Sequence, residues 1–114
     1  MQRTIELKHV EPRTQVRDVL NGQVDRLERK LQGYAPSAIS VHVVFEENRA
    51  HKLFRTSVTC HVPGYVIAAH EEDREAGRAI HEAFKEVLRQ VDKHHDRHQL
   101  KPARRRTTAG DTGT

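Results

Sequence analysis

The sequence predicts an α+β domain with the element order β-α-β-β-β-α, in which a four-stranded sheet carries both helices on one face. Two observations lead to this fold class. Two long segments repeat apolar residues at spacings of three and four, which is the pattern of amphipathic helices. Four shorter segments alternate apolar and polar residues, which is the pattern of strands with one buried face. A chain of 114 residues is long enough for one such domain.

The first strand is predicted over Arg3–Val10, where Ile5 and Leu7 alternate with charged residues. Pro12 disfavours a helical conformation at the residue before it and so ends the strand region. Thr14 is then in place to cap the segment that follows, because its hydroxyl can accept from a free amide of the first helical turn.

The first helix is predicted over Gln15–Leu31. Asn21-Gly22 weakens it, since glycine costs about 1 kcal/mol relative to alanine inside a helix. The apolar phase nevertheless continues across this pair, so we expect a single helix. Its apolar face comprises Val16, Leu20, Val24, Leu27 and Leu31, and its outer face has mixed charge.

Three strands follow in close succession, over Ile39–Glu46, Leu53–Val62 and Tyr65–His70. A polar loop joins the first two, and Pro63-Gly64 forms a tight turn between the last two. Alternation predicts which side of the middle strand is buried. Its core face comprises Phe54, Thr56, Val58, Cys60 and Val62.

The second helix is predicted over Arg74–Arg97, with Asp73 as its N-cap. At about 100° per residue, one side of it is apolar and is expected to pack on the core. This side comprises Ile80, Ala83, Phe84, Val87 and Val91. The other side carries a row of cations, which fits either an anion-binding ridge or an ordinary solvated surface: Arg74, Arg78, Lys85, Arg89 and Lys93.

Composition favours an anionic partner such as nucleic acid or an anionic membrane surface, because 20 Lys and Arg stand against 16 Asp and Glu. The single cysteine excludes a disulfide within the chain and suits a reducing cytoplasm. No apolar run has the length of a signal peptide or a membrane span. We therefore expect a cytoplasmic protein, with residues 1–98 as its domain and 99–114 as a flexible basic tail containing Arg104, Arg105 and Arg106.

Catalytic and metal chemistry find little support in the sequence. His94, His95 and His98 have spacings that metal ligands use on helices, but no further ligand matches them, so we expect no metal or other cofactor. Cys60 and His61 point to opposite faces of a strand, so the histidine is badly placed to activate the thiol. The cysteine is expected in the core, and neither an enzyme nor a small-molecule substrate is expected.

The end of the second helix resembles a known family. Its run Leu88–Arg97 (LRQVDKHHDR) is similar to the Arg-Gln-apolar-x-Lys-His-basic-Asp-basic run of the ribosome hibernation factors, namely short hibernation-promoting factor and ribosome-associated inhibitor. Supporting matches lie at Val10-Glu11, Arg17-Asp18 and Ala79-Ile80, and the resemblance extends over about residues 3 to 98.

This resemblance implies a fold similar to a double-stranded-RNA-binding domain. It also implies binding to rRNA of the small ribosomal subunit, in the channel between head and body that mRNA and tRNA occupy. Translation would then be blocked during stationary phase or stress by a factor that is monomeric off the ribosome. Promotion of ribosome dimers and storage of inactive single ribosomes are both compatible with the sequence. The alternatives are a generic double-stranded-RNA-binding module and a protein-interaction domain for an acidic partner.

Lysine and arginine neutralise phosphates, and Gln90 can bond a base edge or a ribose hydroxyl, so the resemblance implies a set of rRNA contacts. Arg3 and His42 also lie on strands, but we do not include them. Tyr65, beside the Pro63-Gly64 turn, is expected to pack and not to stack on a base. For each residue of the set, passive exposure to solvent is the alternative. The predicted contacts are Lys8, Lys52, Arg55, Arg78, Lys85, Arg89, Gln90, Lys93, His94 and Arg97.

Overall fold

The elements follow the predicted order. A computed structural model describes the backbone of residues 1–10 and 13–100, and the side chains of residues 1–10 and 15–94. Its elements are β1 (Gln2–Lys8), α1 (Arg13–Lys30), the short 3-10 turn η1 (Pro36–Ala38), β2 (Ser40–Asn48), β3 (Leu53–Val62), β4 (Tyr65–Asp73) and α2 (Ala76–Leu100).

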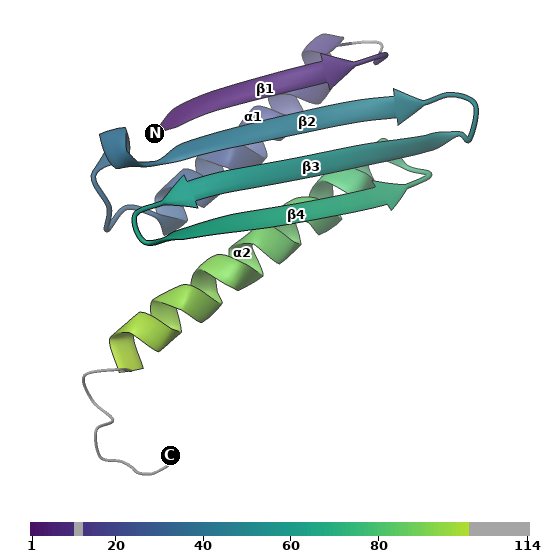
Figure 1. The fold of residues 1–114 in the computed structure, drawn as a ribbon. Coiled ribbons are helices and arrows are strands. Elements are labelled where there is room, and N and C mark those ends of the chain that lie inside the picture. Colours follow the sequence, from purple (N-terminus) through teal and green to yellow (C-terminus); the bar gives the residue numbers. More distant parts are fainter. Residues whose placement is uncertain (11–12, 101–114) are drawn as a thin grey trace.

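The four strands form one mixed sheet in the order β1-β2-β3-β4. β1 and β2 are parallel, with α1 as the crossover between them, whereas β2-β3 and β3-β4 are antiparallel pairs. Both helices lie on the same face of the sheet, with α2 against β3 and β4 and α1 beside β1 (Figure 1). The predicted fold class is therefore confirmed.

The core lies between the sheet and the two helices, and it contains the side chains that periodicity placed there. Alternate residues of the strands are buried against the apolar faces of both helices. Cys60 is among them, and its burial raises the pKa of the thiol to about 11, so the group stays protonated. The largest fully buried side chains are Leu20, Val24, Leu27, Leu31, Val43, Phe45, Thr56, Val58, Cys60, Ile67, Phe84 and Val87.

Arg3 fastens β1 to α1. Its guanidinium donates to Asn21 Oδ1 at 3.0 Å, to Asp25 Oδ1 at 3.0 Å and to Glu28 Oε1 at 2.9 Å. The helix continues through Asn21-Gly22, as predicted, and a side chain added at Gly22 would meet nothing within 4 Å. Asn21, although a poor helix former, contributes here by accepting the hydrogen bond from Arg3 of the neighbouring strand.

The predicted start of α2 is wrong. The helix begins at Ala76, and Asp73 is the last residue of β4 and not the N-cap. The first helical bond runs from the Ala79 amide to the Glu75 carbonyl at 3.0 Å, while the Asp73 carboxylate accepts from the Glu75 amide at 2.9 Å. Asp73 thus shapes the turn before the helix, and Arg74 lies in that turn and outside the helix.

Several other ends differ from the prediction by a few residues. β1 ends at Lys8, where His9 follows with a φ of 59°, and α1 begins at Arg13, so Thr14 lies inside the helix and not at its cap. β4 continues to Asp73, and α2 continues to Leu100. The predicted tail beyond Leu100, with its three arginines, lies outside the described residues. Neither helix of the described chain combines the length and apolarity that a membrane crossing requires.

Candidate nucleic-acid interface

The outer side of α2 carries exposed cations along its length. Arg78, Lys85, Arg89 and Lys93 are exposed, while the opposite side of the helix packs on the core. The distance from Arg78 to Lys93 along the axis is about 22 Å, at about 1.5 Å per residue. One phosphate therefore cannot contact the whole row, but a run of nucleic-acid backbone can. The side chains of His95, Arg97 and His98 lie outside the described residues.

A groove between the two helices adds cations that the sequence did not reveal. This interhelical groove has a volume of about 400 Å³. Arg26 enters it from α1, opposite Lys85 and Arg89 from α2, and Arg29 lies next to Arg26 beside Leu88. Lys30 joins the helices by donating to Asp92 Oδ1 at 2.7 Å. The full lining is Gln23, Arg26, His81, Lys85, Leu88, Arg89 and Asp92.

Arg26 and Arg29 were missed because the outer face of α1 looks mixed when it is read alone. Asp25 and Glu28 appear in sequence to cancel them. In the structure these two carboxylates face β1, where Arg3 occupies them, whereas Arg26 lies toward α2 and Arg29 borders hollows on both sides of α1. The apolar phase of α1 separates the two pairs, but only the position of α2 beside it shows which pair flanks the groove.

Arg89 and Gln90 are held by a common carboxylate. Glu86 Oε1 accepts from Arg89 Nε at 2.8 Å, and Glu86 Oε2 accepts from Arg89 Nη2 at 2.7 Å and from Gln90 Nε2 at 2.9 Å. These bonds, first that from Arg89, lower the pKa of Glu86 to about 2. Lys85 and Lys93 have no ion-pair partner among the described residues, so their charges are available to a ligand.

The predicted strand residues lie on the other side of the molecule. Lys8 and Arg55 project from the sheet face opposite the helices, in a row across the strands in which they alternate with Glu46 and Glu72. Arg55 donates two hydrogen bonds to Glu72, at 3.0 and 2.7 Å. Lys52 is exposed in the β2–β3 turn, with a φ of 54°. The predicted contacts are therefore divided between two surfaces with different charge.

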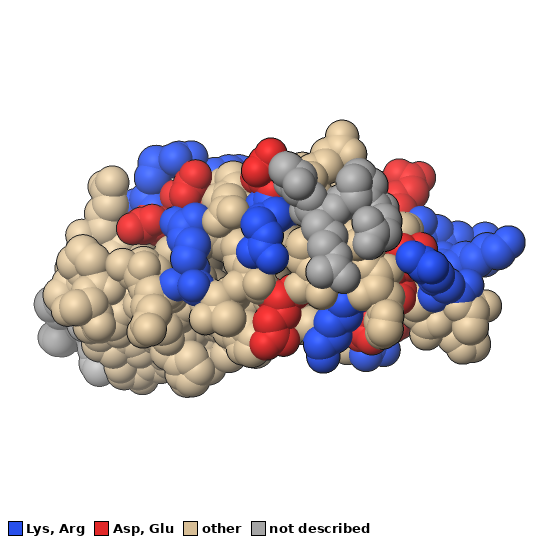
Figure 2. Space-filling model, turned by 90° about the horizontal axis from the view of Figure 1, so that it is seen from above, with Lys and Arg blue, Asp and Glu red and all other residues tan. Residues whose placement is uncertain are grey.

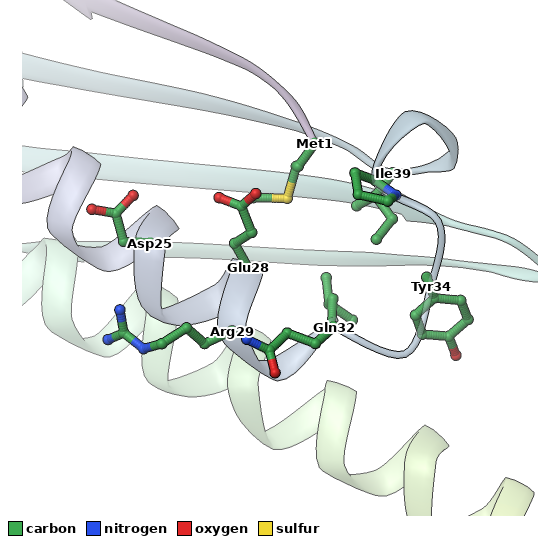
Figure 3. A pocket seen from close by; sticks show the side chains of 9 residues that line it. Met1, Asp25, Glu28, Arg29, Gln32, Tyr34 and Ile39 are labelled. Carbon is green, nitrogen blue, oxygen red and sulfur yellow. The ribbon is translucent and has the colours of Figure 1, made fainter.

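Other surfaces of the described chain suit phosphate less well. Figure 2 shows the molecule from above the view of Figure 1, on the side where β1 lies, and cations and anions are interspersed there. A second hollow of about 400 Å³ lies between the end of α1 and the start of β1. Asp25 and Glu28 line it together with Arg29, and Gln32 and Tyr34 complete much of its wall (Figure 3). Its two carboxylates disfavour an anion, which leaves the interhelical groove as the better phosphate site.

The fold resembles those of several solved structures, among them the following two. The N-terminal domain of Protein Y from Thermus thermophilus superposes with a TM-score of 0.67 at 23% identity, covering 82% of this chain and 98% of that one. A ribosomal subunit interface protein from Coxiella burnetii superposes with a TM-score of 0.61 at 18% identity, covering 84% of this chain and 99% of that one. At these identities the likeness concerns the fold.

Comparison with curated protein sequences gives no match. A sequence model of one protein family does match, over residues 4–99. That range includes every helix and strand apart from the ends of β1 and α2. The family is described as "Sigma 54 modulation protein / S30EA ribosomal protein". Because the match spans most of the 114 residues, this chain belongs to the Sigma 54 modulation protein / S30EA ribosomal protein family.

Proposed function

We propose that this protein is a ribosome hibernation factor that binds the small ribosomal subunit in the cytoplasm. It occupies the channel for mRNA and tRNA and blocks translation during stationary phase or stress. The observation that carries the proposal is the interhelical groove, where Arg26 faces Lys85 and Arg89. The description of the family to which the chain belongs names a ribosomal protein. One solved structure of the same fold is a ribosomal subunit interface protein.

The chemistry of the groove suits an RNA backbone. Two helices present cations on either side of the groove, and the row on α2 extends beyond it, so several phosphates can be contacted at once. Binding of lysine and arginine to phosphates releases counterions, and affinity then falls steeply as salt rises. Folded RNA is recognised largely by shape and backbone, which a rigid pair of packed helices can match.

Inhibition in this proposal is steric and needs no catalytic step. The domain, whose longest dimension is 54 Å, occupies space in a channel that mRNA and tRNA must also enter. A single copy suffices, so we expect a monomer off the ribosome. Cofactors have no part in this mechanism.

Sedimentation tests the proposal directly. The purified protein is mixed with small subunits, large subunits or a generic RNA duplex at physiological salt and separated on a gradient. We expect it to move with small subunits and to inhibit translation of added mRNA. A protein that stays at the top of the gradient with small subunits, or that binds every RNA equally, would contradict the proposal.

Charge reversals then show which surface contacts RNA. Arg26→Glu with Lys85→Glu changes both walls of the groove, and we expect it to weaken small-subunit binding at least about tenfold, with a salt dependence reduced by about one unit of slope per lost phosphate contact. The matched comparison is Lys8→Glu with Lys52→Glu, which changes the same charge away from the helices. If the second pair weakens binding and the first does not, the RNA lies on the open sheet face or the β2–β3 turn.

A further inference from the structure

Among the acidic residues on the exposed side of α2, Glu86 stands out because it is bonded to a member of the cation row, Arg89. Its side chain is about one-third exposed, and it binds Arg89 through both carboxylate oxygens. An acidic residue here reduces the attraction of the surface for any polyanion. Its position therefore needs a reason other than affinity.

Gln90 connects this pair to the sheet. Its side-chain nitrogen has two hydrogens, and both are used, one toward Glu86 Oε2 at 2.9 Å and the other toward the Ala68 carbonyl at 3.1 Å. Ala68 belongs to β4, an edge strand of the sheet. A chain of hydrogen bonds thus runs from the backbone of β4 through Gln90 and Glu86 to Arg89.

The bonding leaves a defined part of Arg89 free. Glu86 takes the Nε hydrogen and one hydrogen on Nη2, which form one edge of the guanidinium. Arginine has five N–H groups, so Nη1 and the second hydrogen of Nη2 remain, and together they form the edge that clamps a phosphate with two bonds. A long side chain is then held with its free edge in one orientation before RNA arrives.

We propose that Glu86 is a specificity-determining residue: it fixes the free edge of Arg89 for one phosphate of folded rRNA and at the same time lowers attraction to RNA in general. The inference rests on the proposed function and adds to it the way in which the surface discriminates. A freely moving Arg89 would follow any phosphate. A fixed Arg89 gains the full benefit only where a phosphate lies at the right place and angle.

The test compares Glu86→Gln with Glu82→Gln. Both remove one negative charge from α2, four residues apart, but Glu82 has no ion pair or hydrogen bond with a described side chain. Affinity is measured for small subunits, for a generic RNA duplex and for heparin. Thermal unfolding of each variant is recorded to show that the fold is intact.

We expect both variants to bind duplex and heparin more tightly, since each has gained net positive charge. Only Glu86→Gln should lose preference, with its ratio of small-subunit to duplex affinity falling about tenfold, the scale of a lost charged hydrogen bond. The Arg89 Nε proton, which is donated to Glu86 in the wild type, should exchange faster in Glu86→Gln. An unchanged preference or unchanged Arg89 exchange overturns the inference. A wild type without preference for small subunits overturns the proposed function itself, and the inference with it.

Discussion

The imidazole of His94 lies flat against the phenol ring of Tyr65, with ring centroids 4.0 Å apart and planes inclined by 11°. Tyr65 begins β4, and its hydroxyl lies 3.4 Å from that of Tyr34, in the segment after α1. Burial, and then the hydrogen bond with Tyr34, raise the pKa of the Tyr65 phenol, so this hydroxyl stays protonated at ordinary pH. Three parts of the chain thus meet at Tyr65, and its stack with His94 ties the late turns of α2 to the sheet.

This contact predicts that His94 acts on RNA binding mainly through position. His94→Phe keeps a flat ring on Tyr65 and should bind small subunits within about twofold of the wild type. His94→Ala removes an aromatic contact of about 0.5–1.5 kcal/mol and should weaken both the helix end and RNA binding. Hydrogen exchange of the amides from 88 to 94 reports on the helix, and sedimentation reports on binding.

Tyr65→Ala supplies the control for the stack. Combined with His94→Ala it should add little to either single change, because both remove the same contact. If His94 instead contacts rRNA through a ring nitrogen, His94→Phe would lose as much binding as His94→Ala while the amides keep their protection. The packing role expected for Tyr65 agrees with this geometry, since His94 already covers one face of its ring.

The bonds to Glu86 predict an unusually acidic carboxylate. Its pKa of about 2 in the folded protein lies below the ordinary value of 4.5. A depressed pKa means that the ionised form stabilises the fold, that this contribution is complete above about pH 4.5, and that it is lost as pH falls through about 2. NMR titration of the Glu86 carboxyl should show this midpoint, and Arg89→Ala should move it upward.

Titration of Glu86 cannot explain an effect of pH on RNA binding near neutrality, because its pKa is about 2. Between pH 5 and 8 Glu86 remains ionised, so the variant Glu86→Gln should differ from the wild type by a constant factor in binding across this range. A difference that grows or shrinks over that interval would show that the carboxyl titrates within it, which contradicts a pKa lowered by the bonds from Arg89 and Gln90.

The fold was predictable because burial leaves a periodic record in the sequence. The alternation in β3 and the spacing of three and four residues in α2 each predict which face is buried, and the structure confirms both faces. The ends were harder to predict, because they depend on single backbone bonds. Asp73 is a good N-cap by type, but the ladder with β3 extends to it and moves the helix start to Ala76.

The candidate site was predictable in part, because a helix fixes which of its residues share a side. Arg78, Lys85, Arg89 and Lys93 do lie on the exposed side of α2, although their contact with rRNA is still a prediction. The sequence does not record which elements become neighbours. For that reason Arg26 was missed. Lys8 and Arg55 are a different case, because strand alternation already places them on the face away from the core.

The bonds of Arg3 to α1 predict that this residue contributes to the stability of the fold and not to ribosome binding. It is about one-quarter exposed and satisfies three acceptors on α1, so Arg3→Met should lower the free energy of unfolding by about 1 kcal/mol, the scale of a partly exposed network. Urea unfolding measures this. Arg49→Met is the matched control, since Arg49 is well exposed and its nitrogen lies 3.9 Å from Glu47. Small-subunit binding should be unchanged in both, and a large loss with Arg3→Met would assign Arg3 to the interface.

Because the hydroxyl of Thr56 is buried, we expect a substitution that removes it to stabilise the fold. Thr56 is fully buried on the core side of β3, and its hydroxyl has no hydrogen-bond partner among the described residues. An unpaired buried hydroxyl costs about 1–3 kcal/mol, so Thr56→Val, which keeps the shape and removes the polar atom, should raise the free energy of unfolding by about 1 kcal/mol. Thr59→Val, at a half-buried position on the open face of the same strand, should change stability far less. Urea denaturation of the two variants checks this, and a loss of stability in Thr56→Val would mean that the hydroxyl has a partner, such as a buried water, in solution.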